Sequence, residues 1–410
     1  MKRLLASLSS AAVLAAPVAV ATVLAPPAAA VGSSAGATAV RAWNEITINT
    51  LVTAKTPTPE QPLYLTYVHR AVYDAVRQTT RHHASSAAAA VAAAHDVLVA
   101  DFPAQKDVLD ADYVTSLAGI PASSRRSAGL AIGSAAAAAV LLDRANDGRN
   151  GAPLPVPPPG PGVWIPTPPN LIGASSWLGG VRPFVLKSAS QFRPSGPPAL
   201  SSTRWAKDYN ETRLYGSATS TKRTPAQTEI AKFWSDAPYV QNQRALRAYA
   251  ENRGLGALQT ARLFALTDTA AADALIACWD AKTHFNFWRP FSAIPAGDTD
   301  GNAATPADLT WQPLLVTPNH PEYPSAHGCA TTAMFTVLAR LSSRHGDHLN
   351  IDIDSVTTGT THHFSSVHQL ISEVANARVW GGLHWRFSTL AGERIGTSVA
   401  HVVLRRNGCG

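Results

Sequence analysis

Apolar residues recur at three- and four-residue intervals over most of this chain of 410 residues, a spacing typical of one face of an α-helix. Alanine, which has the highest helix propensity, is abundant in the N-terminal part, and the alternation typical of strands is rare there. We therefore predict an all-helical N-terminal part. Its expected helices cover residues 37–54, 63–76, 84–100 and 124–147.

A stretch rich in proline, glycine and serine at residues 147–204 interrupts this pattern. Nine prolines lie between Pro153 and Pro169, and such a composition is typical of irregular surface structure. The stretch is either a domain boundary or a loop that wraps around a site. Helical periodicity returns after it, so the predicted parts of the mature chain are residues 31–146, 147–204 and 205–410, which together can also form one domain.

The first thirty residues have the pattern of a secretory signal sequence. Lys2 and Arg3 precede an apolar stretch at residues 4–24, and three alanines at residues 28–30 form a small-residue cleavage site. We expect cleavage and a secreted mature protein; the alternative is an uncleaved membrane anchor. Residues 128–142 are apolar but short, so a buried helix is favoured there over a membrane span, and no transmembrane helix is expected after cleavage.

The overall composition is that of a globular protein, with 46% apolar and 15% charged residues. Lys and Arg exceed Asp and Glu by 34 to 27, giving a formal charge of +7, and the sequence has no long basic run. Nucleic acid is therefore not an expected partner. A local site for a small oxyanion is compatible with this balance.

Three cysteines, Cys278, Cys329 and Cys409, are too few for a disulfide-dense scaffold. Cys278 and Cys329 flank two of the motifs described next, so we expect them to lie close together. They form either a disulfide or a pair of buried thiols.

The tetrapeptide Pro324-Ser325-Ala326-His327 stands directly before an apolar run with helical spacing and therefore predicts a helix start. Backbone N–H groups in the first turn of a helix lack intrahelical acceptors, and the helix dipole is positive there. An anion bound beside Ser325 and His327 is the natural expectation.

Two cations stand near the end of a long predicted helix that begins at residue 257. Lys282 and Arg289 are seven residues apart, which on one helix places them within about 20° of the same face and roughly 10 Å apart along the axis. We expect Pro290 to end this helix. The pair either converges on a small anion or belongs to a solvated basic face.

A second pair, Arg378 and His384, is six residues apart, so the two side chains would point about 120° apart on a continuous helix. Gly381 and Gly382 between them predict a break between two helices, which lets both side chains face a common point. For His384 the alternative is a hydrogen-bonded core histidine.

These three pieces, in this order, resemble the signature of the vanadium-dependent haloperoxidases, which belong to the type 2 phosphatidic acid phosphatase superfamily. The resemblance covers residues 205–410, and residues 69–76 are similar to an early helix of that family. It implies an all-α fold, with helical bundles around a buried oxyanion site and a long Pro-rich surface loop. The cofactor that it implies is vanadate.

The resemblance also implies a role for each matching residue. His384 would bind vanadium, and His327 would be the acid–base group. Lys282, which also counts among the catalytic residues, would hold vanadate oxygens together with four others: Arg289, Ser325, Ala326 and Arg378. A Zn²⁺ site formed by His320, His327 and His384 is not favoured, because three cations and no evident carboxylate would surround it.

The sequence departs from the family pattern at three positions. Ala326 replaces the usual glycine and Ala377 a common serine, while Ser388 stands where an aspartate that would orient the ligand histidine is often found. Asp236 resembles an acidic residue that supports the second arginine.

Two residues match the family's halide pocket. Trp279 is similar to an aromatic residue of chloroperoxidases and His320 to a histidine of bromoperoxidases. Bromide or iodide is favoured over chloride.

The resulting prediction is a secreted peroxidase that uses hydrogen peroxide to oxidise a halide to hypohalous acid, which then reacts with an unknown organic acceptor. Two alternatives stay open because one fold hosts several chemistries. The first is an acid phosphatase in which His384 attacks phosphorus and His327 protonates the leaving oxygen. The second is a protein that binds oxyanions without turnover.

Overall fold

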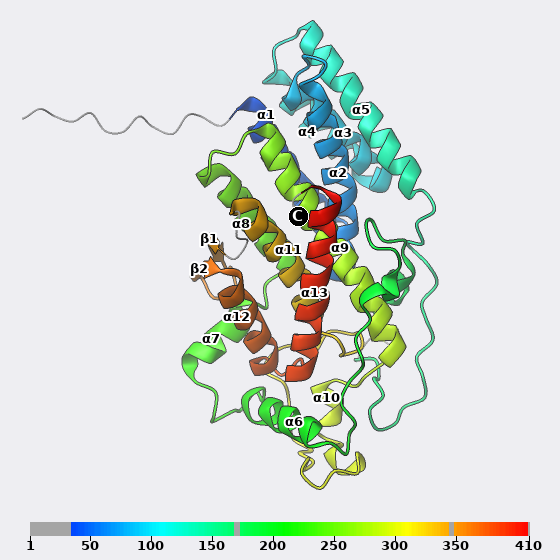
Figure 1. Cartoon of the computed structure of the whole chain (residues 1–410), viewed down its shortest axis with the longest axis vertical. Helices are drawn as coiled ribbons and strands as arrows, with labels where there is room; N and C mark the ends of the chain where they lie inside the picture. The colour runs from blue at the N-terminus through cyan, green and yellow to red at the C-terminus, as the bar shows by residue number, and fades with distance from the viewer. Residues whose placement is uncertain (1–33, 168–172, 344–347, 409–410) are drawn as a thin grey trace, which may run out of the picture. The chain divides into compact units, whose positions relative to one another are not determined.

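Helix α9 (Ala257–Phe285) is the longest helix in the computed structural model, which describes residues 34–167, 173–343 and 348–408. One side of α9 packs against α2 (Gln61–Thr79), and another packs against α11 (Ala326–Ser342) and α13 (Arg386–Arg406). It therefore belongs to both the N-terminal and the C-terminal group of helices (Figure 1).

The N-terminal group confirms the helical prediction for that part of the chain. Its further helices are α1 (Ala35–Thr53), α3 (Ser86–Asp101), α4 (Lys106–Ala118) and α5 (Ser124–Arg144). Helix α4 was not predicted, and α5 is not the buried helix that we expected. Gly129 and Gly133 of α5 lie so close to α3 that an added Cβ would be 2.5 and 2.4 Å from the carbonyl oxygens of Ser85 and Ala89, whereas much of its other surface is exposed.

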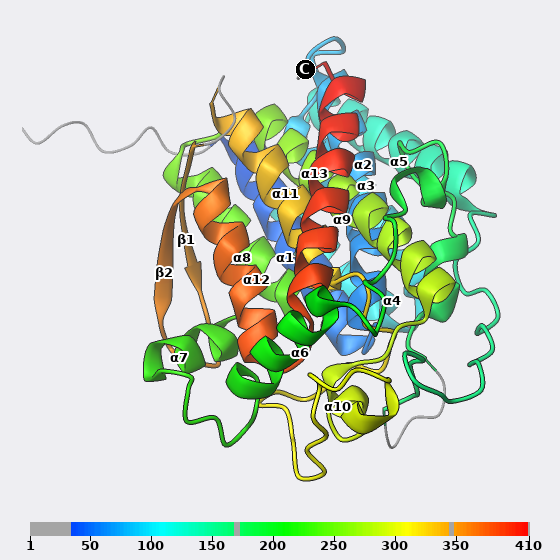
Figure 2. The ribbon, with the colours of Figure 1, turned by 60° about the horizontal axis from the view of Figure 1, so that its bottom comes forward.

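Besides α9 and α11, the C-terminal group contains the other helices from residue 203 onward. They are α6 (Thr203–Tyr215), α7 (Pro225–Phe233), α8 (Pro238–Asn252), the short α10 (Pro290–Ala293), α12 (Val367–Trp380) and α13. Figures 1 and 2 show α11 and α13 side by side. The prediction of an all-α fold is confirmed, with one small exception.

The exception is an antiparallel hairpin of β1 (His348–Asp354) and β2 (Thr361–Ser366). Buried apolar residues of β1 alternate with exposed polar residues, which is the pattern of a strand with one covered face. Helix α12 begins directly after β2, at Val367, where the Ser366 hydroxyl accepts a hydrogen bond from the Gln369 backbone N–H.

The Pro-rich connection contains no α-helix in its described part, only two 3₁₀ turns at Ser176–Gly180 and Ala189–Phe192. Its residues 162–164 pair with residues 286–288: the Trp164 N–H donates to the Asn286 carbonyl at 2.8 Å, and the Trp288 N–H to the Gly162 carbonyl at 3.1 Å. The connection thus lies directly beside the segment that leads to Arg289.

Two predictions fall on residues outside the described ranges, namely the signal sequence at residues 1–30 and Cys409. Within the described ranges, one unbroken helix, α5, is long enough and apolar enough to cross a bilayer.

Candidate functional site

A cavity of about 560 Å³ lies where α8, α9, α11 and α12 meet the segments before α11 and α13. Its lining includes seven of the site residues predicted from the sequence: Asp236, Trp279, His320, Ala326, His327, Arg378 and His384. Residues separated by almost 150 positions in the chain therefore line one cavity.

Lys282, in the last turns of α9, is completely buried. Its ammonium group donates hydrogen bonds to the carbonyl oxygens of Pro321 at 2.7 Å, Glu322 at 3.0 Å and Pro324 at 2.5 Å. Burial lowers the pKa of Lys282 to about 8. These three carbonyls occupy all three N–H donors of the ammonium. Lys282 therefore holds the segment before Ser325 in place and contributes positive charge to the site.

Arg289 reaches the site from the segment that follows α9 and not from that helix. The prediction that Lys282 and Arg289 share one helix is wrong, because Asn286 adopts a left-handed conformation (φ 43°) and ends α9. Arg289 instead caps α10. Its Nε donates to the His320 carbonyl at 2.8 Å and its Nη1 to the Leu383 carbonyl at 3.0 Å, so it ties together the two segments that flank the cavity.

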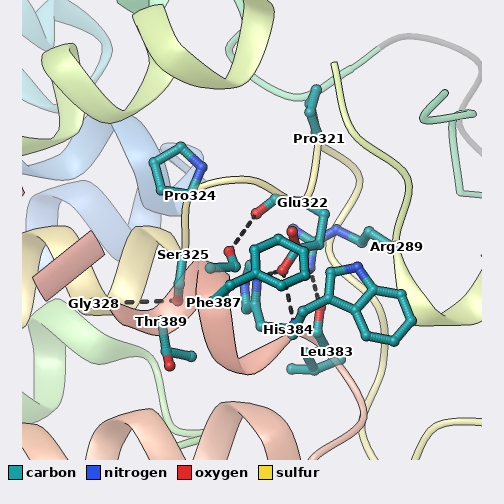
Figure 3. Close-up of polar contacts among 12 residues, drawn as sticks. Arg289, Pro321, Glu322, Pro324, Ser325, Gly328, Leu383, His384, Phe387 and Thr389 are labelled. Atoms are coloured by element: carbon teal, nitrogen blue, oxygen red, sulfur yellow. Dashed lines mark hydrogen bonds and ion pairs between the residues drawn. The ribbon is translucent and has the colours of Figure 1, made fainter. Parts of the chain in front are cut away.

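His384 lies between α12 and α13, after the predicted break: Gly382 has φ 74°, a left-handed conformation that favours glycine. The imidazole Nδ1 is 2.8 Å from Oε1 of Glu322, and the same oxygen accepts a hydrogen bond from the Trp385 backbone N–H at 3.0 Å. Figure 3 shows the two side chains facing each other. A buried carboxylate thus accompanies the histidine.

Glu322 corrects two expectations from the sequence. We saw no carboxylate near the cations, and we expected the serine at position 388 to leave His384 without an acidic partner. Glu322 supplies that partner from a different segment, and Ser388 instead donates its hydroxyl to the Glu322 backbone carbonyl at 3.4 Å. The sequence shows that Glu322 lies in a Pro-containing segment close to Ser325. Periodicity does not predict the direction of a side chain in such a loop, so the contact with His384 was not predicted.

The electrostatics of this pair favour a neutral imidazole. Burial, followed by the charges of Arg289 and Lys282, lowers the pKa of His384 well below its ordinary value. Burial raises the pKa of Glu322 to about 7. A neutral ring whose Nδ1–H donates to Glu322 carries its lone pair on Nε2, which is the form of histidine that binds a metal or acts as a nucleophile.

Ser325 is the N-cap of α11, as predicted, and its Oγ accepts a hydrogen bond from the Gly328 N–H at 3.4 Å. The Ser325 N–H donates to the Ser388 carbonyl at 3.1 Å. Gly392 of α13 permits this close approach, because an added Cβ would lie 2.5 Å from the Ser325 carbonyl oxygen. Packing between α11 and α13 therefore fixes the start of α11.

His327 lies in the first turn of α11, and its buried Nε2 has no hydrogen-bond partner within the described residues. Burial and the charge of Arg378 lower the pKa of His327 well below its ordinary value. The ring is thus a neutral group that can take up or release a proton at an atom directed away from competing protein partners.

Arg378 occupies the last turn of α12 and is also buried. Its Nη1 donates to the Trp234 carbonyl at 3.2 Å, whereas its Nε has no partner among the described residues. Burial lowers the pKa of Arg378 to about 9. An arginine with a buried, unpartnered donor in a cavity is suited to an anionic ligand.

Asp236 lines the same cavity but has other partners than predicted. Its carboxylate accepts hydrogen bonds from the backbone N–H groups of Val356 at 2.7 Å and Thr357 at 3.1 Å. No hydrogen bond or ion pair joins it to Arg378 within the described part of the chain. Asp236 thus anchors the turn between β1 and β2.

The two residues of the expected halide pocket lie together, with 4.9 Å between the ring centroids of Trp279 and His320. Burial and the charge of Arg289 lower the pKa of His320 well below its ordinary value. Its Nδ1 lies 3.0 Å from Nη2 of Arg289. This corner of the cavity combines an aromatic wall with a nearby guanidinium.

Cys278 and Cys329 are free thiols, so the disulfide considered from the sequence does not form. Cys278 lies one turn before Lys282, and Cys329 one turn after Ser325. Both are fully buried, and the Cys278 sulfur donates to the Pro324 carbonyl at 3.6 Å.

The arrangement as a whole is built for a compact anion. Lys282, Arg289 and Arg378 bring three buried cations together around a helix start and a neutral histidine. The unpartnered donor of Arg378 and the unpartnered Nε2 of His327 are exceptions to the rule that buried polar groups are hydrogen-bonded. A tetrahedral oxyanion supplies acceptors for such donors.

Comparison with known proteins agrees with this geometry. Residues 262–407 match the family described as the VCPO second helical-bundle domain. Vanadium chloroperoxidase from Curvularia inaequalis is 29% identical over 238 residues, which are 43% of this chain and 38% of that protein. The chain therefore matches well under two thirds of the length of this curated relative.

Two solved structures resemble the chain over most of its length. A bacterial vanadium-dependent iodoperoxidase has a TM-score of 0.76 and 25% identity, and the match covers 90% of this chain and 96% of that chain. A holo-type bacterial vanadium-dependent chloroperoxidase shares the fold with a TM-score of 0.68 and 20% identity, over 86% of this chain and 93% of that one.

Proposed function

We propose that the chain is a vanadate-dependent enzyme of the vanadium-dependent haloperoxidase family, to whose members it is similar in sequence and fold, and that it oxidises halide with hydrogen peroxide. The observation that carries this proposal is the convergence of three buried cations on a neutral His384, whose Nδ1–H is engaged by Glu322 at 2.8 Å. This geometry leaves the Nε2 lone pair as the one basic ring atom of His384 for a ligand.

The residues of the site fit vanadate. His384 would bind vanadium through Nε2, and the Arg378 and Ser325 side chains and the first-turn backbone N–H groups would face its oxygens. Lys282 would add positive charge, since its N–H groups are already directed at three carbonyls. When bound, the group supplies a Lewis acid that activates peroxide without a change in its own oxidation state.

The protein's own residues then perform two tasks. Lys282, Arg289 and Arg378 stabilise negative charge from buried positions, where such interactions are stronger than at an exposed surface. His327 exchanges a proton with the peroxide oxygen at its unpartnered Nε2. The overall reaction balances as X⁻ + H₂O₂ + H⁺ → HOX + H₂O, in which the halide is oxidised by two electrons and the O–O bond is broken.

For the halide we propose bromide or iodide in preference to chloride. The support is the position of His320, which is buried beside Trp279 and Arg289. Replacing His320 with phenylalanine tests its role: the ratio of kcat/KM for bromide to that for chloride should change, while an unchanged ratio would remove His320 from halide choice.

The decisive experiment uses purified protein reconstituted with orthovanadate. Bromination of a phenolic dye should require hydrogen peroxide, bromide and vanadate together, and His384→Ala should abolish it. The absence of turnover with both bromide and iodide would refute the proposal.

A second candidate is an acid phosphatase, because a neutral histidine oriented by a carboxylate is also a competent nucleophile toward phosphorus. This candidate requires hydrolysis of an aryl phosphate in the absence of vanadate, with inhibition when vanadate is added. A protein that only binds oxyanions would show affinity for vanadate and neither activity.

We also propose that the protein is exported, from the signal-sequence pattern of residues 1–30. Sequencing the N-terminus of the protein recovered from the culture medium should show cleavage near residue 30. Retention of the intact leader in the cell membrane would contradict it.

A further inference from the structure

The cavity extends from the oxyanion site along α8, where Tyr239 and Asn242 line its wall. These residues are three positions apart, so their side chains lie on the same face of α8, one turn from each other. The Tyr239 side chain is 4% exposed and the Asn242 side chain 1% exposed. Neither belongs to the set of residues that surrounds the oxyanion.

The side-chain oxygen of Asn242 is a hydrogen-bond acceptor to which no described residue donates. Its Nδ2 lies 3.8 Å from the Met334 sulfur, which can only accept a hydrogen bond, so the amide is oriented with its nitrogen toward the sulfur. Its Oδ1 then has no partner in the described part of the chain. The Tyr239 hydroxyl likewise makes no hydrogen bond with a described residue. A buried acceptor such as Asn242 Oδ1 is normally satisfied, so a ligand with a donor fits here.

The separation between Asn242 and His327 can be estimated along α11. Met334, which contacts Asn242, is seven residues after His327, a rise of about 10 Å along the helix. His327 and Asn242 therefore mark two separated places on the cavity wall. The lining of the same cavity also includes the apolar side chains of Leu275, Leu315 and Leu383.

The volume and lining define the class of ligand. About 560 Å³ lies within the usual range for sites that enclose a small organic molecule. We propose that this cavity binds the organic acceptor of the reaction, an aromatic alcohol or an N–H heteroarene, with its donor on Asn242 Oδ1 and Tyr239 and its reacting carbon toward His327. The binding step stands on the cavity alone, whereas the transfer step rests on the proposed peroxidase function.

The transfer is a balanced electrophilic substitution, ArH + X⁻ + H₂O₂ + H⁺ → ArX + 2 H₂O. A C–X bond forms, the C–H bond breaks, and its proton leaves in water. Hydrogen peroxide is the oxidant, and it is the one that the proposed activity already uses. Enclosure of the acceptor means that the oxidised halogen is transferred inside the cavity before it diffuses away.

The binding step is tested on the protein without vanadate or halide. Titration with 2-naphthol and with 2-methoxynaphthalene, followed by calorimetry, compares a ligand that has a donor with one that lacks it. We expect 2-naphthol to bind about tenfold more tightly, as one hydrogen bond to an otherwise unsatisfied buried group would give. Equal affinities, or no saturable binding, would overturn the inference.

Variants assign the effect to the two named groups. Asn242→Leu and Tyr239→Phe should each reduce the preference for 2-naphthol, and thermal unfolding checks that each variant is folded. Tyr249→Phe is the matched control, because this tyrosine lies on the same helix but its hydroxyl bonds to Ser342 outside the cavity. A preference that survives in both cavity variants would refute the assignment.

The transfer step needs a separate readout. Triiodide formation from iodide, without any organic acceptor, measures halide oxidation, and its absence counts against the proposed function but not against binding. In an equimolar mixture of the two naphthalenes, the ratio of brominated products should exceed the ratio given by free hypobromite about tenfold. Identical ratios would show that transfer takes place in solution and would overturn the transfer step.

Discussion

Glu322 and His384 form a fully buried pair in which Oε1 and Nδ1 are 2.8 Å apart. The same carboxylate oxygen also accepts the Trp385 N–H, so it holds both the ring and the backbone that follows it. A carboxylate on the second nitrogen fixes the tautomer and orientation of a ligand histidine. The chain thus orients His384 from the segment before α11 and does not need an acid at position 388.

Replacing Glu322 with alanine should weaken vanadate binding about 10- to 100-fold, the usual effect of removing such a partner. The Nδ1–H and the Trp385 N–H would both lose their acceptor in a buried place. Glu322→Gln retains an acceptor oxygen and should recover most of the affinity. Equilibrium titration with vanadate measures both variants, and an alanine variant with unchanged affinity would contradict the positioning role.

His327→Ala should lower turnover by about 10²- to 10⁴-fold, as expected for loss of an acid–base group. Oxyanion binding should change far less, because the three cations and His384 remain. Steady-state kinetics of bromination and a vanadate titration separate the two quantities. A parallel loss of affinity and turnover would show that His327 is mainly a binding residue.

Oxyanion affinity should fall as the pH rises above about 8. Burial lowers the pKa of Lys282 to about 8 and of Arg378 to about 9, and a cationic group loses its charge above its pKa. Binding an anion above these values requires proton uptake, which reduces the affinity by up to about tenfold per pH unit for each group. Titration with tungstate, which remains a dianion over this range, measures the effect; affinity that is constant or rises above pH 8 would contradict it.

The lowered pKa of Lys282 has the opposite effect on the stability of the ligand-free protein, which should increase with pH. The pKa of Lys282 is about 8 in the folded protein against 10.5 for an unperturbed lysine, so the unfolded chain binds more protons between these values. The contribution of Lys282 to the free energy of unfolding therefore increases with pH over this interval. The difference between wild type and Lys282→Met in urea unfolding should vary with pH in that direction.

Gly392→Ala should destabilise the protein by about 1–3 kcal/mol and reduce activity. The added Cβ would lie 2.5 Å from the Ser325 carbonyl oxygen and 3.1 Å from the Cys329 nitrogen, both backbone atoms, so α13 must move away from the start of α11. Gly119→Ala is the control, because the nearest atom to its added Cβ is 3.8 Å away. Chemical denaturation and bromination assays should affect the first variant and spare the second.

Much of the fold and of the site was predictable because it depends on local patterns. The Ser325 cap and the break at Gly381 and Gly382 follow from residue types next to periodic runs, and the structure has both. The end of α9 was missed because asparagine enters the left-handed conformation only sometimes, and Pro290, four residues after Asn286, was the stronger signal.

The contacts between distant segments were not predictable in this way. The role of Glu322 depends on how Lys282 holds the segment from Pro321 to Pro324, which no periodicity reveals. The hairpin of β1 and β2 was not predicted because the alternation typical of a strand extends over only the seven residues of β1. Asp236 was assigned to Arg378 by resemblance, whereas its partners are backbone groups of the turn in that hairpin.

The burial of Cys278 and Cys329 bears on how long an enzyme with the proposed activity would survive its own product, a hypohalous acid. Hypohalous acids attack thiols and thioethers, and susceptibility follows exposure. Every sulfur-containing side chain in the described ranges, the two cysteines and Met334, has 0% exposure. Product that escapes from the cavity therefore meets a surface without accessible sulfur in those ranges, and self-inactivation during sustained turnover should be slow.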